Sequence, residues 1–291
     1  MSPAAPARPR VSVVMPALDP DPGFFEQALR SLLGQTIAEI EVLVVEAGSS
    51  PALETVPDRL GDPRVKRLPA SRPSLVEQRN LGLHNATSDL VAFLDVDDVA
   101  APKRFERQIK FLTDHPGVAV LGSRLVIIDA AGRPIGSRTY PTTHLAIVRQ
   151  MPHSNAIAGP SVMVRRDVVL EGGGFQYDRF GGMAEDYELW SRLARAGVHF
   201  ANLDEYLTFY RVHPRATKAR RTRDHLRATI DIKTMYWADR MGAAGRLRLI
   251  VERLMTYAPP ALVYRAFGLF YAKSPPGVVV PFLAQGTRGD P

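Results

Sequence analysis

The chain of 291 residues is long enough for one large domain or two smaller ones, and 45% of its residues are hydrophobic, as in globular proteins. It has no cysteine, which excludes disulfides, thiolate metal sites and a cysteine nucleophile. The formal net charge of +7 is unevenly divided, because residues 1–210 hold 22 basic and 25 acidic side chains and residues 211–291 hold 15 and 5. This division argues against a nucleic-acid-binding protein that is basic throughout, and it indicates an anionic partner for the C-terminal segment.

We expect no export signal and no membrane-spanning helix. Residues 1–10 are rich in proline, alanine and arginine and lack the apolar run of a secretory signal, so they are expected to be a disordered leader. No stretch approaches the ~20 apolar residues of a spanning helix, since Arg265 and Lys273 interrupt the most hydrophobic region.

The first third of the chain alternates short β-branched runs with helical patterns. The expected strands are residues 11–15, 41–46, 65–68 and 90–94. The expected helices between them are residues 24–35, 51–60 and 74–85. This alternation predicts an α/β fold with a mostly parallel sheet that helices cover on both faces. In such a fold, ligands bind at the carboxyl ends of the strands.

Later segments predict more of the sheet and then a helical C-terminal region. We expect helices at residues 102–115 and 184–196, strands at 118–128 and 159–164, and a hairpin turn at 129–133. Beyond His213 the chain is rich in arginine, and amphipathic or apolar helical segments follow. Among these, residues 247–255 have one apolar helical face and residues 261–271 are apolar nearly all round.

Three acids, Asp95, Asp97 and Asp98, come directly after the expected buried strand at 90–94. Carboxylates packed so closely repel one another and raise each other's pKa unless a cation lies between them. Oxygen ligands of this kind favour Mg²⁺ or Mn²⁺, which in proteins usually also bind the phosphates of a substrate. The alternative is a solvated turn in which Asp98 caps the next helix.

Two further acids, Glu185 and Asp186, lie at the start of the last expected helix of this region. Acids are common there because the positive end of the helix dipole stabilises them, and that interpretation is the simpler one. The glycine-rich approach over residues 172–182 would instead let a loop present Asp186 into a cleft, with Tyr187 and Trp190 limiting the access of water. A carboxylate placed in that way can act as a general base.

Three weaker signals leave alternatives open. Arg211 and His213 follow an apolar run. A lone histidine is more often structural than functional, and for His213 both interpretations stay open. A polar turn begins at Glu46, at the end of the second expected strand. Arg79, in an expected helix, could be a solvated cation or a ligand of a phosphate group.

Taken in order, six short motifs resemble those of the family-two glycosyltransferases, which have the nucleotide-sugar-binding GT-A fold. The motifs are VSVVMPA at 11–17, VVEAGS at 44–49, QRNLG at 78–82, FLDVDD at 93–98, EDYELW at 185–190 and YRVH at 210–213. Each alone is short, but six in the right order and spacing are specific. The resemblance covers residues 11–213 and implies a GT-A domain there. The expected disordered leader at 1–10 precedes this domain, and a basic amphipathic helical region at 214–291 follows it.

The resemblance also implies which residues bind the donor. Pro16 and Ala17 would line the pocket for the base and ribose, and Glu46 would take the place of the family's first acid there. Arg79 would approach the donor phosphates, and Asp95 would face the ribose.

The remaining implied roles concern the metal and the chemistry. Asp97 and His213 would hold Mn²⁺ or Mg²⁺ at the diphosphate, where the cation takes up the negative charge of the leaving group. Asp186 would accept the proton of the attacking acceptor hydroxyl, and a single displacement of this kind inverts the anomeric carbon. The supporting residues would be Asp98 at the turn, Glu185 near the acceptor, Trp190 beside the cleft, and Arg211 over the diphosphate.

The sequence departs from the family pattern at two positions. Ala47 replaces the second acid at the end of the second strand, and Leu18 replaces a tyrosine. Because an alanine side chain cannot hydrogen-bond the edge of a base, the resemblance leaves the nucleobase of the donor open.

Two other interpretations compete with this one. Asp95 and Asp97 also resemble the nucleophile and the acid/base of haloacid-dehalogenase-type phosphatases, although that motif normally opens its domain. A non-catalytic adaptor at a membrane surface would explain Ala47, but it has no need of both Asp97 and Asp186.

The basic C-terminal region suggests where the protein acts. It can simply pack on the catalytic body, or it can rest on an anionic membrane surface through residues 215–273. We predict a metal-dependent inverting glycosyltransferase that is cytoplasmic and peripheral on the inner face of a membrane. Its partners would be a nucleotide-sugar donor and a glycan or lipid-linked acceptor, and no nucleic acid.

Overall fold

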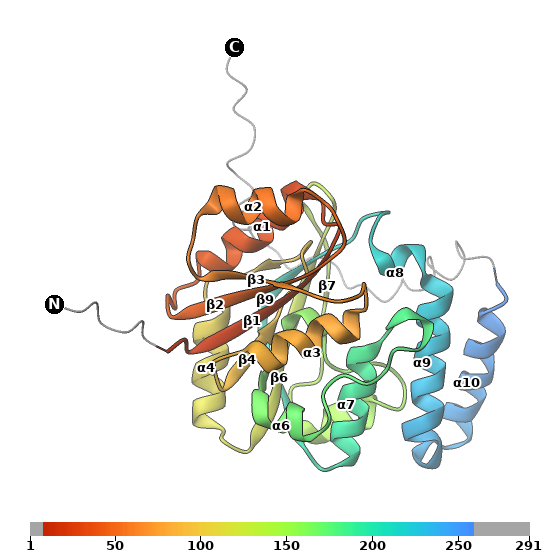
Figure 1. The fold of residues 1–291 in the computed structure, drawn as a ribbon. Coiled ribbons are helices and arrows are strands. Elements are labelled where there is room, and N and C mark those ends of the chain that lie inside the picture. The colour runs from red at the N-terminus through yellow and green to blue at the C-terminus, as the bar shows by residue number, and fades with distance from the viewer. Residues whose placement is uncertain (1–7, 259–291) are drawn as a thin grey trace.

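The computed structural model describes residues 8–258, which form a mixed α/β body with a pair of helices at its C-terminal side (Figure 1). Most of the expected leader at 1–10 and the expected apolar helix at 261–271 lie outside the described residues.

A single sheet of nine strands forms the centre of the body. Its order is β3-β2-β1-β4-β8-β6-β9-β5, and β7 pairs with β6. The strands β1 to β4 are parallel to one another, whereas β8 runs antiparallel to both of its neighbours, β4 and β6. The strands are β1 (Val11–Leu18), β2 (Ile40–Ala47), β3 (Val65–Pro69), β4 (Leu90–Phe93), β5 (Val99–Ala100), β6 (Val118–Ile128), β7 (Pro134–Arg138), β8 (Met163–Arg165) and β9 (His199–Arg211).

Helices cover both faces of this sheet, which explains why its central strands are apolar on both sides. In β1, Val13 packs into the core under one set of helices and Val14 into the core under the other. The first set is α1 (Pro22–Leu33), α2 (Ala52–Leu60) and α4 (Arg104–Asp114). The second set is α3 (Leu75–Asn85), α5 (His144–Gln150), α6 (Arg166–Glu171), α7 (Glu185–Arg195) and α9 (Thr222–Trp237).

The expected strands and helices of the first third are confirmed to within a few residues, as is the hairpin turn between β6 and β7. The strand expected at 159–164 is present but begins later and is shorter than predicted. Residues Gly159–Ser161 form a 3₁₀ turn instead, and β8 begins only at Met163. Pro160 explains the difference, because proline has no N–H to donate to a neighbouring strand.

A close approach of α3 to the sheet sets the geometry of the strand ends. A Cβ atom on Gly82 would lie 2.4 Å from Cγ1 of Val14, so only glycine allows this contact. One turn earlier, the buried Gln78 donates from Nε2 to the carbonyl of Ala17, at 3.1 Å, and to that of Val45, at 2.7 Å. The same helix therefore joins the carboxyl ends of β1 and β2.

The first long helix of the C-terminal region, α9, packs into the core of the α/β body. Trp237 of α9 is fully buried in the core under the second set of helices, and its Nε1 donates to Oγ of Ser191 at 3.0 Å. The short α8 (Thr217–Arg220) precedes α9, and α10 (Ala243–Met255) lies beside α9 in Figure 1. Within residues 8–258, no helix has the length and apolar content that crossing a membrane requires.

Candidate active site

The turn after β4 carries the three acids, and Asp98 joins this turn to the end of β9. Its Oδ1 accepts the backbone N–H of Arg211 at 2.8 Å, and its Oδ2 has no hydrogen-bond partner among the described residues. Burial, together with the nearby carboxylates of Asp97 and Asp95, raises the pKa of Asp98 well above its ordinary value. The alternative in which Asp98 caps the next helix is wrong, because α4 begins only at Arg104.

Arg211 at the end of β9 is almost fully buried, and its guanidinium is bonded within the protein. Nε donates to the carbonyl of Asp97 at 2.8 Å, and Nη2 donates to Oε1 of Gln27 at 2.8 Å. The guanidinium also lies 4.4 Å from the ring centroid of Phe24. Arg211 therefore joins β9 to the acidic turn and to α1.

Asp97 and His213 lie side by side, with 3.0 Å between Oδ2 and Nε2. Both side chains keep some exposure, 26% for Asp97 and 11% for His213. One oxygen and one imidazole nitrogen make a donor set that suits Mn²⁺ and is compatible with Mg²⁺. Among residues 8–258, no three carboxylate or imidazole side chains form a complete metal site. The pair thus fits a cation that takes its other ligands from phosphates and water.

Arg79 lies in the interior between the two acidic segments. Its side chain is 4% exposed, and its guanidinium pairs with Glu185 at 2.7 Å and with Asp95 at 3.5 Å. The same group lies over the rings of Phe93 and Phe175, at 5.6 and 5.3 Å from their centroids. Arg79 therefore connects α3, β4 and α7.

The crowding of carboxylates expected from the sequence is present in the structure. Burial raises the pKa of Glu185 to about 8, while Arg79 opposes this rise and Asp186 adds to it. Burial likewise raises the pKa of Asp95 to about 6, against the effect of Arg79. We call the part of the sheet edge that holds Asp95, Asp97, Asp98, Glu185 and Asp186 the acidic edge. A cation added there would stabilise the charged carboxylates.

Asp186 is held at the start of α7 by neighbours that the sequence does not single out. Its Oδ2 accepts from Nδ2 of Asn155 at 3.2 Å, and its Oδ1 accepts the backbone N–H of Tyr187 at 2.7 Å. A Cβ atom on Gly159 would lie 2.6 Å from Oδ2, so this glycine makes room for the carboxylate. Ala184, two residues earlier, has a φ of +62°. The side chain of Asp186 remains partly exposed in this position.

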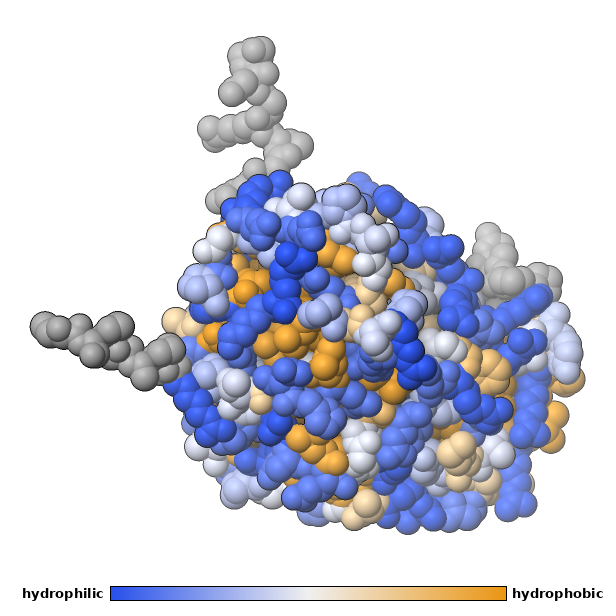
Figure 2. Space-filling model, viewed as in Figure 1, coloured by the Kyte–Doolittle hydropathy of each residue, from blue (hydrophilic) through white to orange (hydrophobic). Residues whose placement is uncertain are grey.

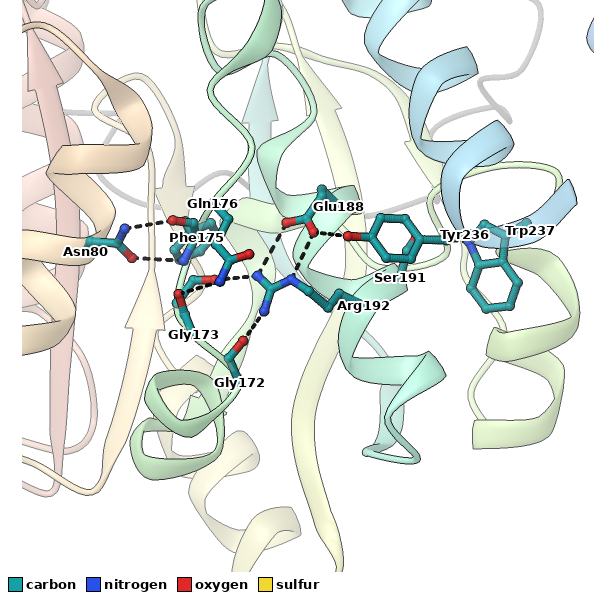
Figure 3. Close-up of polar contacts among 11 residues, drawn as sticks. Asn80, Gly172, Gly173, Phe175, Gln176, Glu188, Ser191, Arg192, Tyr236 and Trp237 are labelled. Atoms are coloured by element: carbon teal, nitrogen blue, oxygen red, sulfur yellow. Dashed lines mark hydrogen bonds and ion pairs between the residues drawn. The ribbon is translucent and has the colours of Figure 1, made fainter.

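The glycine-rich approach to Asp186 is fixed from two helices (Figure 3). Asn80 of α3 makes two hydrogen bonds to the backbone of Phe175, at 2.8 and 2.9 Å. Arg192 of α7 donates to the carbonyls of Gly172 and Gly174. Gly174 has a φ of +64°, and a Cβ atom there would lie 2.6 Å from Oδ1 of Asn80. Glycine is therefore required where the segment turns toward α7.

The helix α9 is tied to α7 through Glu188, which is buried (Figure 3). One oxygen of Glu188 accepts from Oη of Tyr236 at 2.5 Å and from Nε of Arg192 at 2.9 Å. Trp190, on the same helix, is fully buried, with its ring 6.4 Å from that of Phe175. Trp190 thus belongs to the core behind the site in this structure, rather than to the wall of a cleft.

The expected donor-binding residues lie at the carboxyl ends of β1 and β2. Pro16 and Ala17 are buried, and Glu46 forms an ion pair with Arg67 at 2.5 Å. Asp19, which the sequence does not single out, has a φ of +42°. Its Oδ1 accepts the backbone N–H groups of Ser49 and Ser50, at 3.1 and 3.0 Å. This bridge joins the loops that follow the two strands.

The chain matches proteins of known name over most of its length. It is 29% identical over 214 residues to the amylovoran biosynthesis glycosyltransferase AmsE of Erwinia amylovora, covering 72% of this chain and 79% of that protein. It is 24% identical over 220 residues to the UDP-Gal:alpha-D-GlcNAc-diphosphoundecaprenol beta-1,3-galactosyltransferase of Escherichia coli, covering 73% and 78%.

Two solved structures share the fold. The 1–349 fragment of S. aureus TarS in complex with UDP-GlcNAc has a TM-score of 0.61 and 18% identity, with 90% of this chain and 71% of that chain covered. This chain covers 42% of the longer TarS crystal structure. The mannosyltransferase PcManGT of Pyrobaculum calidifontis, in complex with GDP-Man and Mn²⁺, has a TM-score of 0.59 and 17% identity, with 90% and 74% covered. The expected GT-A fold is thereby confirmed.

The comparison with family models gives the decisive match. The model described as Glycosyl transferase family 2 matches residues 12–173, which is more than half of the chain and includes the acidic turn after β4. The chain therefore belongs to glycosyltransferase family 2.

Proposed function

We propose that this glycosyltransferase moves a sugar from a nucleotide-sugar donor to a hydroxyl group of a glycan or lipid-linked acceptor, with inversion of the anomeric carbon. The observation that carries the proposal is the position of Arg79, whose guanidinium pairs with Asp95 and with Glu185. This link brings the acids after β4 to the residue that precedes Asp186. The carboxylates that would bind the nucleotide-sugar donor and the carboxylate that would act as the base then lie at the same edge of the sheet. A single displacement step requires this proximity.

The donor would bind across the carboxyl ends of β1, β2 and β4. Asp95 would face the ribose, with Arg79 as its positioning residue, and the loops joined by Asp19 would border the base. Asp97 and His213 would hold Mn²⁺ or Mg²⁺. When bound, such a cation stabilises the negative charge of the departing diphosphate. Two proteins with the same fold support this assignment, one in complex with UDP-GlcNAc and the other with GDP-Man and Mn²⁺.

Asp186 would be the general base. The acceptor oxygen forms a bond to the anomeric carbon while the bond from that carbon to the diphosphate oxygen breaks, and the hydroxyl proton passes to a carboxylate oxygen of Asp186. Attack from the face opposite the leaving group inverts the anomeric carbon. Asn155 and the N–H of Tyr187 hold the carboxylate in place, so little reorganisation is needed when the acceptor arrives.

The acceptor would belong to the assembly of a polysaccharide or glycolipid, at the cytoplasmic face of a membrane. Support comes from the names of two relatives, one of amylovoran biosynthesis and one that acts on a diphosphoundecaprenol-linked sugar. Membership of the family favours transfer over the phosphatase interpretation of Asp95 and Asp97. A non-catalytic adaptor predicts no turnover, so the experiment below separates it from the proposal.

A panel of UDP-, GDP- and dTDP-sugars, scored for transfer and for slow donor hydrolysis, tests the proposal. We expect turnover of at least one donor with Mn²⁺ or Mg²⁺, and loss of that turnover with a chelator or with Asp97→Ala. Asp114→Ala is the matched control, since that exposed carboxylate pairs with Lys110 on α4 and its replacement should leave turnover unchanged. Absence of metal-dependent turnover with every donor would contradict the proposal.

A further inference from the structure

The helix α10 presents an apolar strip to solvent. The side chains of the strip recur at helical spacing, and each is exposed by 49% to 81%. They are Leu247, Ile250, Val251, Leu254 and Tyr257. In an ordinary surface helix, the apolar face packs inward and the polar face meets water. In α10 one apolar face meets solvent instead.

The face of α10 that meets α9 is held by a buried ion pair. Nζ of Lys233, on α9, donates to both oxygens of Glu252 at 2.8 Å, and the two side chains are 4% and 13% exposed. Leu249 packs against the core residues Leu226 and Ile230 of α9. Glu252 is the single carboxylate of α10 and points inward, so the orientation of the apolar strip toward solvent is fixed by an ionic contact.

The charges that border the apolar strip are positive. Arg246, Arg248 and Arg253 are exposed on α10. Arg248 also pairs with Glu252 at 3.0 Å, and Arg253 donates to Oγ1 of Thr234 at 3.3 Å. Figure 2 shows hydrophobic atoms among hydrophilic ones at the edge of the molecule where α10 lies. A bilayer with anionic lipids has negative headgroups above apolar acyl chains. An apolar strip bordered by arginines is complementary to both layers.

We propose that the outward face of α10 docks on an anionic lipid bilayer, with the apolar strip among the acyl chains and the arginines at the headgroups. A contact between two copies of this face is disfavoured, because a two-fold axis would bring the arginines of both copies together. The docking is argued from α10 alone. It rests on the proposed function only for its biological purpose, which is access to a lipid-linked acceptor. The contacts of α9 with α7, through Glu188 and Trp237, would hold α7, which carries Asp186, at a fixed height above the bilayer.

Flotation of the full chain with vesicles tests this docking. The vesicles are phosphatidylcholine alone and phosphatidylcholine mixed with phosphatidylglycerol. We expect wild type to bind the anionic vesicles about tenfold or more above the neutral ones, since each basic residue near the surface adds to binding. Leu247→Ser with Leu254→Ser should lower binding by roughly tenfold, because two apolar side chains leave the acyl region. Arg246→Gln with Arg253→Gln should remove the preference for anionic vesicles.

Leu145→Ser is the matched control, because Leu145 is 58% exposed on α5 and is not part of the apolar strip, so its loss should leave binding unchanged. Donor hydrolysis should be the same in all these variants, so a failure of docking is distinguishable from a failure of the proposed function. Equal flotation of wild type and of the Leu247→Ser, Leu254→Ser variant would overturn the proposal. So would a wild-type dimer in light scattering that this variant converts to a monomer, or protection of residues 259–291 from protease that this variant removes.

Discussion

Replacing Asp186 with asparagine is expected to lower the rate of sugar transfer by about 10²- to 10⁴-fold, because an amide cannot take the proton of the acceptor hydroxyl. The amide oxygen can still accept the N–H of Tyr187, while the bond from Asn155 is lost. Because the side chain is partly exposed, the fold should be kept. The measurement is the initial rate of transfer at saturating donor, together with the free energy of unfolding. Donor affinity should change little.

A matched control for this variant is Asp167→Asn. Asp167 also lies in the first turn of a helix and accepts the N–H of the next residue, Val168, at 2.8 Å. It lies near the start of β4, at the end of the sheet opposite the acidic turn, so its replacement should leave the rate unchanged. If Asp186→Asn keeps transfer within a few-fold of wild type, Asp186 is not the base.

Replacing Arg79 with methionine is expected to lower the free energy of unfolding by about 3–5 kcal/mol, since it removes one partner of a buried ion pair. Glu185 would lose the guanidinium 2.7 Å away, and Asp95 would lose its positioning contact. Chemical denaturation at neutral pH measures the effect. Adding Glu185→Gln should recover part of the loss, because a neutral amide avoids the cost of burying or protonating a carboxyl that has lost its partner.

The exposed ion pair of Arg107 with Glu205 provides the comparison for this variant. Both side chains are more than a third exposed, and the closest atoms lie 2.9 Å apart. Arg107→Met should therefore cost less than about 1 kcal/mol. A cost of that size for Arg79→Met as well, or a double variant no more stable than the single one, would show that Arg79 does not hold the two acidic segments together.

Local patterns in the sequence predict much of the fold because they report burial. The run Val11–Met15 is apolar on both sides, and in the structure Val13 and Val14 pack into cores on opposite faces of the sheet. The same reasoning failed at Pro160, where an apolar run contains a residue that cannot pair as a strand. Hydrophobicity indicates that such a segment is buried, but the missing N–H decides its conformation.

The candidate site was predictable where its residues lie within one motif, and not where they meet through space. Asp95, Asp97 and Asp98 are adjacent in the chain, so their crowding is visible in the sequence. Asn155, by contrast, reaches Asp186 across 31 positions. No periodicity or spacing in the sequence reports such a contact, since it depends on how the β6–β8 connection crosses the start of α7.

The charge of the C-terminal region shows a similar limit. The excess of basic residues beyond residue 210 predicts an anionic partner, but it does not distinguish outward from inward charges. In the structure, Lys233 is 4% exposed and paired with Glu252, whereas Arg246 is exposed on the far side of the same helix pair. The packing of α9 against the core, through Trp237, decides which basic side chains face inward and which face solvent.

Calorimetric titration of UDP, GDP and dTDP into the full chain, with and without Mn²⁺, tests most directly whether the acidic edge is a metal-dependent donor site. At least one nucleotide should bind roughly tenfold or more tightly with the metal, as expected when a cation joins Asp97 and His213 to a diphosphate. Asp97→Ala should lose that gain, while Asp114→Ala should keep it. Binding that is equally tight with and without Mn²⁺, in wild type and Asp97→Ala alike, would contradict the assignment of this edge.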